Sequence, residues 1–367
     1  MDAAEAYLRL ALVNGLGPIT IHRLLAAVEQ PAAVFGLTMR ELTSIDGVGA
    51  ERARRIVDPG LAEAAANERA VCHANAVQVI TLADDAYPRQ LRELSDPPAA
   101  IWLRGEWQRR DALAVSIVGP RRPSAYGHRQ ARVFSQGLAR LGCCVVSGLA
   151  RGVDTVAHEA AIAEQGRTIA VLGSGFGHLY PAENSGLADR IAADHGVVMS
   201  EYPYATRPSS GTFPRRNRLI AALGLGTLVI EAGQRSGSLI TARLAGELGR
   251  AVMALPGPID RPDNQGSNRL LRDGAVLITS LEDVIEEIPP LATLAAATPE
   301  SPSDHPRISS LTQRERQVYQ LLSDDPRSID ELQRISQLPA SAVSATLISL
   351  ELRRLARKTP GGYTSAT

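Results

Sequence analysis

The sequence predicts an α/β protein with a doubly wound parallel sheet, a small all-α N-terminal domain and a C-terminal winged-helix domain. Three observations lead to this prediction. The 367 residues suffice for about two or three domains of roughly 150 residues each. Between residues 113 and 288, short apolar runs alternate with amphipathic stretches of helical length. A segment rich in Pro, Ala, Ser and Thr at 289–307 has linker composition and precedes a last unit at 308–367.

The central region, residues 59–288, contains the predicted sheet. Its strands are expected at 114–118, 143–147, 168–172, 197–200, 228–230, 251–255 and 276–278. Continuous apolar strands indicate burial on both faces, as in a parallel sheet covered by helices. Such sheets bind ligands beyond the carboxyl ends of their strands, so the segments that follow the strands are the candidate site. Residues 77–82 and 100–103 are two further strand candidates.

Residues 1–58 read as short helices with two similar turns. Gly15-Leu16-Gly17 precedes a helix near 19–28, and Gly47-Val48-Gly49 precedes a helix near 50–57. Glycine permits a tight turn with positive φ, and each following helix begins with amides that can hold a phosphate. The pattern resembles paired helix-hairpin-helix modules. The segment contains six Arg and seven acids, so a purely structural role is as well supported as DNA binding.

Residues 308–367 predict three helices, at 313–322, 329–336 and 340–350, followed by a β-hairpin around 356–363. This order is typical of a winged helix-turn-helix. The third helix begins with Ala340-Ser341-Ala342-Val343 and lacks the Arg, Asn, Gln and Lys that read base edges. Protein contact or a degenerate wing is therefore favoured over base-specific readout.

The charge distribution points to a polyanion more clearly than the net charge does. Lys plus Arg and Asp plus Glu both number 39, so the net charge indicates no partner. Between residues 112 and 153, however, there are six arginines and no acid, and between 202 and 230 there are four more and again no acid. Local fields of this kind attract polyanions.

Nothing in the sequence predicts secretion or a membrane span. The three cysteines form no C-x-x-C pair, Asp2 and Glu5 do not suit a signal peptide, and no apolar run approaches the ~18 residues of a spanning helix. We therefore expect a reduced, cytoplasmic protein.

Turns of small residues and arginines follow the predicted strands. Small residues leave the backbone open to an anion, and arginines add charge. The candidate nucleic-acid-binding residues in these turns are Arg121, Ser147, Gly148, Arg151, Gly173, Ser174, Gly175, Arg235 and Ser236. Glu231, directly after a strand, is interpreted as a structural partner of an arginine or an amide, with a catalytic carboxylate as the alternative.

The segment Phe213-Pro214-Arg215-Arg216-Asn217-Arg218 combines an aromatic ring, an amide and three arginines. A single-stranded nucleic acid stacks a base on such a ring, worth ~1–3 kcal/mol, while arginines follow its backbone. The alternative is a core phenylalanine beside a solvated arginine face, which the segment taken alone favours.

Motifs for other chemistry are missing. There is no G-x-S-x-G elbow and no P-loop, and the Gly173 turn has His178 where the dinucleotide fingerprint needs a third glycine. Asp154 and His158 share a helical face without a third metal ligand. The sequence thus predicts no metal, no cofactor and no catalytic residue.

Taken together, the motifs resemble the bacterial DNA-processing protein A (DprA/Smf) family. The matching elements extend in order over some 160 residues. They are Gly119 with Arg121, Ser147-Gly148-Leu149-Ala150-Arg151-Gly152-Val153-Asp154, Gly173-Ser174-Gly175 with Tyr180-Pro181, Ser200-Glu201-Tyr202-Pro203, the 213–218 segment, Ser236-Gly237-Ser238 and Arg272-Asp273-Gly274-Ala275.

The resemblance implies an extended Rossmann-like domain that binds single-stranded DNA without sequence preference. It also implies loading of RecA recombinase onto incoming DNA in natural transformation, a homodimer and no catalytic activity. In this interpretation Arg121, Arg215 and Arg218 take phosphates, Phe213 takes a base, Asn217 lies beside them, and the glycine turns donate amides. Pro120 departs from the family pattern and removes one amide donor.

Two other functions are compatible with parts of the sequence. A nucleotide N-glycosidase-type enzyme on a Rossmann-like fold would use Glu231 with Arg235 and the Ser236 turn, although the second acid of such sites is missing. A transcriptional regulator would rest on the winged helix, whose third helix carries no base-reading residues.

Overall fold

The computed structural model describes residues 1–297, 311–323, 326–353, 355–359 and 361–365. The chain forms two compact units, Met1–Thr298 and Pro299–Thr367, and each has its own hydrophobic core. Within the described residues, no helix combines the length and the apolar character needed to cross a membrane. Cys72, Cys143 and Cys144 are buried free thiols, so they form no disulfide framework, as expected.

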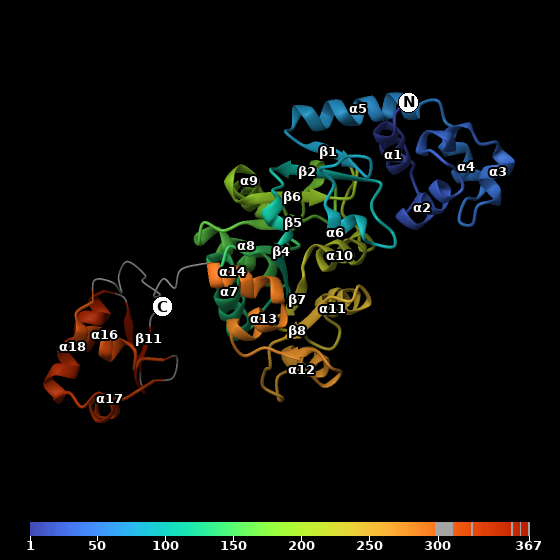
Figure 1. The fold of residues 1–367 in the computed structure, drawn as a ribbon. Coiled ribbons are helices and arrows are strands. Elements are labelled where there is room, and N and C mark those ends of the chain that lie inside the picture. The colour runs from blue at the N-terminus through green and yellow to red at the C-terminus, as the bar shows by residue number, and fades with distance from the viewer. Residues whose placement is uncertain (298–310, 324–325, 354, 360, 366–367) are drawn as a thin grey trace. The chain divides into compact units, whose positions relative to one another are not determined.

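Nine strands of the first unit form one sheet, in the order β1-β2-β6-β5-β4-β3-β7-β8-β9 (Figure 1). Neighbours from β6 to β9 are parallel, whereas β1 and β2 add an antiparallel edge. All seven strands predicted from the apolar runs are present, which confirms the α/β fold. The strands are β1 (Gln78–Thr81), β2 (Ala100–Gly105), β3 (Ala114–Val118), β4 (Cys144–Ser147), β5 (Thr168–Val171), β6 (Gly196–Ser200), β7 (Gly226–Val229), β8 (Ala251–Ala254) and β9 (Val276–Leu277).

Helices cover both faces of the sheet because successive residues of its strands point to opposite sides. In β3, Val115 and Ile117 belong to the core under α7 (Ala125–Arg140) and α8 (Val153–Ala163), with α13 (Leu281–Glu287) and α14 (Pro289–Ala297) beside them. Ala114 and Val118 belong to the core under α10 (Thr212–Leu223) and α11 (Gly237–Glu247). The remaining helices of this region are α6 (Arg89–Arg92), α9 (Ser185–Arg190) and α12 (Gln265–Arg272).

The direction of the chain reverses at the middle of the sheet. From β3 the strands proceed outward through β4 and β5 to β6, and α10 then returns the chain to β7, on the other side of β3. In open α/β sheets this reversal leaves a crevice at the carboxyl ends of the strands, where ligands bind. The first turn of α10 follows the loop after β6, where the chain starts back toward β7.

The N-terminal helices form the two predicted hairpins. They are α1 (Ala3–Leu12), α2 (Pro18–Ala26), α3 (Met39–Ser44), α4 (Ala50–Ile56) and α5 (Leu61–Ala74). Gly15 and Gly47 have φ of +81° and +86°, values that glycine adopts without strain. The helix of each hairpin holds the turn of the other: Arg55 donates to the Asn14 carbonyl at 2.8 Å, and Arg23 donates to the Asp46 carbonyl at 3.3 Å.

The hairpins and the sheet belong to one packed unit. Trp102 of β2 is fully buried, and its indole N–H donates to Glu68 of α5 at 2.8 Å. The same carboxylate accepts the Tyr204 amide at 2.6 Å. Because α5 is tied to both β2 and the loop after β6, it holds the N-terminal helices against this edge of the sheet.

The predicted linker is wrong in its first half. Residues 289–297 form α14, and Leu291 is fully buried in the core beneath α7. Proline is favoured in the first turn of a helix, so the Pro289-Pro290 pair begins α14 rather than a linker. Residues 298–307 lie outside the described residues.

The second unit is the predicted winged helix. It contains α16 (Gln313–Tyr319), α17 (Ile329–Ser336) and α18 (Ala340–Leu352), followed by the hairpin of β10 (Ala356–Thr359) and β11 (Gly362–Ser365). Val318, Leu332, Val343 and Leu347 are fully buried between the three helices. The apolar character of α18 is thus used for packing.

Candidate nucleic-acid interface

Two arginines and two aromatic rings form a row at the carboxyl edge of the sheet. The Arg121 guanidinium lies 5.3 Å from the centroid of the Phe213 ring. The Phe213 and Tyr180 rings are 5.7 Å apart and tilted by 56°, and the Arg151 guanidinium lies 5.6 Å from the Tyr180 ring. We call these four side chains the cation-aromatic row. Arg121 and Arg151 are exposed, so the row is open to solvent.

Each member of the row comes from a different segment of the sheet edge. Arg121 follows β3, Arg151 follows β4, Tyr180 follows β5 and Phe213 lies in the first turn of α10. Gly173 allows the close approach of Phe213, because a Cβ atom there would lie 2.6 Å from the Phe213 ring. The row therefore exists only when four chain segments meet.

The two arginines of the row differ in their partners. Arg151 forms an ion pair with Glu183, and the bonds to that carboxylate hold the pKa of Arg151 above its usual range. Within the residues that the structure describes, Arg121 forms no ion pair with an acid. Its neighbour in the cation-aromatic row is the Phe213 ring. Arg121 is therefore the cation of the row that is available to a phosphate.

The turn after β4 does not offer its amides to a ligand. The amides of Gly148 and Ala150 donate to the Asp154 carboxylate at 3.1 and 3.3 Å, and the Leu149 amide donates to His158 Nε2 at 3.3 Å. The expectation that these amides bind DNA is wrong, because the first turns of α8 already satisfy them.

In the turn after β5, the amide of Gly175 is likewise held by the protein. The Gly175 amide donates to the Thr206 carbonyl at 2.9 Å, and a Cβ atom at this position would overlap the carbonyls of Pro203 and Tyr204. Gly175 is therefore required for close packing of two loops. Its amide already donates to Thr206 and is therefore not available to DNA, contrary to the prediction.

Arg216 supports the turn after β4 from below. Its side chain is buried, and its Nη1 donates to the Gly148 carbonyl at 2.7 Å and to the Val171 carbonyl. A Cβ atom at position 148 would overlap this guanidinium, which explains the glycine there. Burial lowers the pKa of Arg216, and the neighbouring Asp154 opposes that shift. The positive charge lies beneath the row without reaching solvent.

Three predicted site residues are structural. The Ser147 hydroxyl is buried and donates to the Ile117 carbonyl at 2.7 Å, and Ser174 is 1% exposed. Arg218 is 8% exposed and forms ion pairs with Glu201 and with Asp96, the latter at 3.4 Å. A guanidinium already shared by two acids is not available for a phosphate, so the predicted phosphate contact of Arg218 is wrong.

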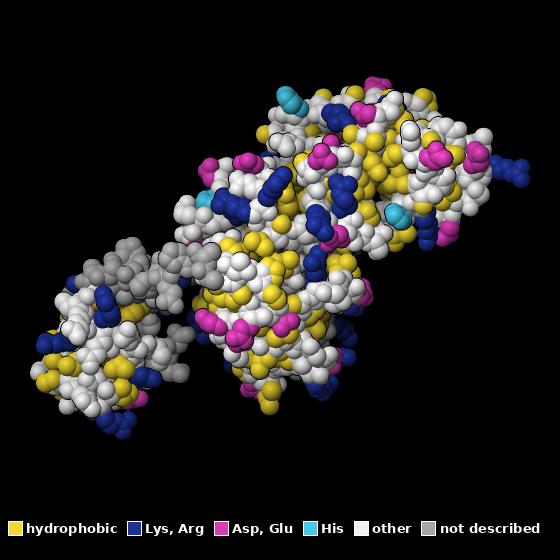
Figure 2. Space-filling model, viewed as in Figure 1, with side chains coloured by type: hydrophobic (Ala, Val, Ile, Leu, Met, Phe, Trp, Pro, Cys, Tyr) yellow, Lys and Arg dark blue, Asp and Glu magenta, His cyan; other side chains and the backbone are white. Residues whose placement is uncertain are grey.

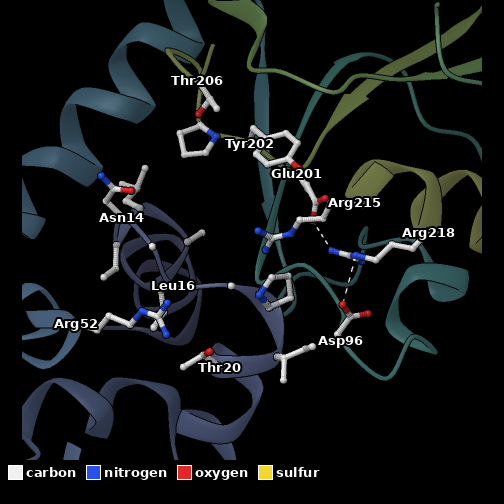
Figure 3. A pocket seen from close by; sticks show the side chains of 18 residues that line it. Asn14, Leu16, Thr20, Arg52, Asp96, Glu201, Tyr202, Thr206, Arg215 and Arg218 are labelled. Carbon is white, nitrogen blue, oxygen red and sulfur yellow. Dashed lines mark hydrogen bonds and ion pairs between the residues drawn. The ribbon is translucent and has the colours of Figure 1, made fainter. Parts of the chain in front are cut away.

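The remaining predicted residues lie at other places on the first unit. Arg215 is exposed and lines a cleft beside the N-terminal hairpins (Figure 3). Asn217 donates to the Gly237 carbonyl at 3.4 Å, and Ser236 caps α11 by accepting the Ser238 amide at 3.3 Å. Arg235 lines a separate depression together with residues of α11 and α12, so it does not join the row.

Glu231 anchors the start of α7. It is fully buried, and its Oε2 accepts the Ser124 amide at 2.9 Å, which confirms the predicted amide partner. Gly127 leaves the space for this carboxylate. Among the described residues, no group of three His, Cys, Asp or Glu side chains is placed to hold a metal ion.

Two residues of this region were absent from the predicted set. The signal for Tyr180 in the sequence is the Tyr180-Pro181 element after a predicted strand, and the structure leaves 37% of this residue exposed. Arg216 lies between the predicted Arg215 and Arg218 on α10. Successive residues of a helix point about 100° apart, and Arg216 is on the side that faces the sheet. The helical spacing of these arginines could therefore have identified Arg216 as the one that is buried.

Comparisons with known proteins agree along the whole chain. Residues 78–289 match the family model described as DNA recombination-mediator protein A, residues 7–58 match a SAM-like helix-hairpin-helix tandem, and residues 295–362 match the DprA winged-helix domain. The chain is 38% identical over 277 residues to protein Smf of Escherichia coli, covering 76% of this chain and 74% of that protein. It is 31% identical over 391 residues to protein Smf of Synechocystis, covering 98% of both.

Solved structures give the same result. The X-ray structure of DNA processing protein A from Streptococcus pneumoniae matches with a TM-score of 0.67 and 34% identity, covering 78% of this chain and 99% of that one. DNA processing protein A from Helicobacter pylori, described for its single-stranded DNA binding mode, matches with a TM-score of 0.52 and 32% identity over 60% of this chain and 97% of that one.

Fold and comparisons together define a DNA-processing protein built from helix-hairpin-helix, extended Rossmann-like and winged-helix parts. The chain belongs to the DNA-processing protein A (DprA/Smf) family.

Proposed function

We propose that this protein binds single-stranded DNA without sequence preference, with the strand lying along the cation-aromatic row. The observation that supports this proposal is the row itself: Arg121, Phe213, Tyr180 and Arg151 follow one another at 5.3 to 5.7 Å. Unpaired bases stack on aromatic rings, and every base has such a face. The relative from Helicobacter pylori, whose structure is described for its single-stranded DNA binding mode, supports the choice of single-stranded DNA as the ligand.

Strand selectivity follows from the same chemistry. In a duplex the bases are stacked on each other and cannot reach Phe213 or Tyr180. Arg121, exposed and without an acid partner in the described part of the chain, adds a phosphate contact. Because neither ring nor guanidinium reads a base edge here, affinity depends on strandedness and salt.

Polarisation titration tests this proposal. Labelled single-stranded and duplex oligonucleotides of one sequence are titrated with the full chain at two salt concentrations. We expect the single strand to bind more tightly, with a salt slope of about −0.7 per phosphate contact. Arg121→Ala weakens binding and lowers that slope, whereas Arg132→Ala on the exposed side of α7 serves as the matched control. Equal binding of Arg121→Ala and wild type would refute the assignment.

The proposed biological role is delivery of the bound strand to RecA recombinase in natural transformation, in the cytoplasm and by binding rather than catalysis. Membership of the DprA/Smf family supports this role. The test is the rate at which RecA assembles on single-stranded DNA precoated with single-strand-binding protein. We expect acceleration by wild type and loss of it with Arg121→Ala. No acceleration by wild type would contradict the role.

We also propose a homodimer. Ile259 is 89% exposed and Leu277, on the edge strand β9, is 54% exposed, so this part of the unit presents apolar side chains to solvent. Light scattering of the wild-type chain tests the proposal. A dimer mass that becomes a monomer mass in Leu277→Arg would support it, whereas a monomer mass in the wild type would refute it.

A further inference from the structure

We infer that Glu183 restrains DNA binding, because its carboxylate competes with a phosphate of the strand for the Arg151 guanidinium. This inference rests on the proposed single-stranded DNA binding. It assigns a role to the acid that an ion pair joins to the cation-aromatic row: Glu183 lowers the affinity for the strand and speeds its release.

The ion pair occupies the donors that a phosphate needs. Arg151 Nε and Nη2 both donate to the Glu183 carboxylate, the latter at 3.0 Å, and Nη1 donates to the Tyr180 hydroxyl at 3.2 Å. A guanidinium binds carboxylates and phosphates through the same two parallel N–H groups. The bonds from Arg151 also lower the pKa of Glu183, so its carboxylate is ionised. Glu183 therefore takes the position on Arg151 that a phosphate would take.

The backbones of both partners are fixed by the fold. Glu183 belongs to the short helix η4 (Ala182–Asn184), and the buried Asn184 side chain donates from Nδ2 to the Leu149 carbonyl at 2.9 Å. Arg151 follows the turn after β4, whose amides are held by α8. The two side chains thus meet without any loop movement, and rotation of the side chains alone separates them.

The exposure of the pair makes exchange with a phosphate inexpensive. The Arg151 and Glu183 side chains are 47% and 53% exposed, whereas Arg218 and Glu201 are nearly buried. Water solvates the separated charges of an exposed pair, so that such pairs contribute little to stability, but separating a buried pair is costly. A phosphate can therefore displace Glu183 from Arg151, while Arg218 stays with Glu201.

The position of Arg151 in the row distinguishes this pair from others. On the face drawn in Figure 2, Lys and Arg side chains lie close to Asp and Glu side chains at several places, so an exposed ion pair alone indicates no site. Arg151, however, ends the row that begins with Arg121. A base stacked on Phe213 or Tyr180 has a phosphate on either side, and the two arginines lie at the two ends. Arg121 is available to one phosphate, and Glu183 competes with the other.

Three substitutions separate competition from general charge effects. Glu183→Gln removes the competing charge and keeps the size of the side chain. Arg151→Met removes the guanidinium for which the two anions compete. Glu164→Gln is the matched control, because Glu164 forms another exposed pair through two bonds, at 2.9 and 2.8 Å from Arg140, at the opposite end of α7 from the row.

Affinity and dissociation rate are measured with the full chain and a labelled oligothymidylate of roughly 16 nucleotides. We expect Glu183→Gln to bind about threefold to fivefold more tightly than wild type, the range of an exposed ion pair. Its dissociation into excess unlabelled strand is expected to slow by a similar factor, since affinity differences within one interface lie mostly in dissociation. Glu164→Gln is expected to match wild type in both measurements.

The double variant shows whether the gain acts through Arg151. We expect Glu183→Gln to gain clearly less affinity in the Arg151→Met background than in wild type. In the Glu183→Gln background, Arg151→Met is expected to lower the salt slope by about 0.7, the share of one phosphate contact. The melting temperature of Glu183→Gln is expected to equal that of wild type, because the pair is exposed.

Several results would overturn the inference. Weaker binding by Glu183→Gln would mean that Glu183 supports Tyr180 through Arg151 instead of competing with DNA. An equal gain in the Arg151→Met background, or a gain of the same size in Glu164→Gln, would reduce the effect to general repulsion. An unchanged affinity of Glu183→Gln, while Arg121→Ala weakens binding, would overturn the inference and leave the proposed function intact. A wild-type chain that binds no single strand would contradict both.

Discussion

Arg215 and Arg218 lie three residues apart on α10, yet the structure predicts opposite consequences when each is replaced by methionine. Arg215 is exposed and faces the cleft, whereas the Arg218 side chain is 9% exposed and the Glu201 side chain that it pairs with is 3% exposed. Arg218→Met therefore leaves a buried carboxylate without its partner. Arg215→Met removes an exposed charge, whose Coulombic attraction for the same Glu201 carboxylate is smaller than that of Arg218.

The magnitude follows from the burial of the pair. Breaking a buried ion pair by removing one partner costs about 3–5 kcal/mol of unfolding free energy. At roughly 2 °C per kcal/mol in a unit of this size, Arg218→Met is expected to lower the melting temperature by about 6–10 °C. Arg215→Met is expected to lower the melting temperature much less than Arg218→Met and to weaken DNA binding.

The assay combines thermal unfolding with polarisation titration of single-stranded DNA below the transition. The double variant Arg218→Met with Glu201→Leu removes both buried charges and is expected to recover most of the lost stability, because apolar replacement of a buried pair is often neutral. A melting temperature of Arg218→Met equal to that of wild type, combined with strongly reduced DNA affinity, would refute the structural assignment of Arg218.

Three further predictions address the row and the turns beneath it. Phe213→Leu is expected to weaken single-strand binding about tenfold, because stacking of ~1–3 kcal/mol is lost, with little change in melting temperature. Phe213→Tyr is expected to retain binding. Equal titration curves for Phe213→Leu and wild type would contradict this prediction. Gly175→Ala is expected to lower the unfolding free energy by about 1–3 kcal/mol, because its Cβ overlaps the Pro203 carbonyl, while Gly237→Ala, with nothing within 4 Å, leaves it unchanged in chemical denaturation. Burial lowers the pKa of His158 to about 3, so between that value and its unfolded pKa of roughly 6.5 the unfolded chain binds the extra proton and stability falls as the pH falls. Melting curves from pH 7 to 5 are expected to decline more steeply for wild type than for His158→Gln, and parallel curves would exclude this titration.

The tautomer of His158 gives the physical reason for that pH dependence. Thr168 Oγ1 donates to the Val145 carbonyl at 2.6 Å, so it accepts from His158 Nδ1 at 2.6 Å. Nε2 is then the acceptor of the Leu149 amide. Protonation of Nε2 would place its N–H against the Leu149 N–H, so that two donors would face each other without an acceptor. Asp154 acts in the opposite sense, because burial raises its pKa and the folded state then holds a proton more readily above pH 3.8.

The architecture was predictable because it is set by local patterns. Seven apolar runs predicted seven strands, the Gly15 and Gly47 turns predicted the two hairpins, and the order of helices after residue 308 predicted the winged helix. Each of these signals lies within a few residues of the chain, where strand burial, glycine conformation and helix period act directly. The linker prediction failed at 289–297 because composition alone does not show that Leu291 finds a core.

The positions of Arg121 and Phe213 at one edge of the sheet were also predictable. Arg121 directly follows a buried strand of the parallel sheet, and Phe213 lies at the start of the helix that connects β6 to β7. The sequence by itself thus determined the layers, the sheet and the edge that carries the site. Only the tertiary structure decided which charges are available there. Arg215, Arg216 and Arg218 are chemically identical, and their directions on α10 send the first to a cleft, the second beneath a glycine turn and the third to two acids far away in sequence. Because a charge is neutralised or exposed by neighbours that only folding brings together, residue type alone could not distinguish them.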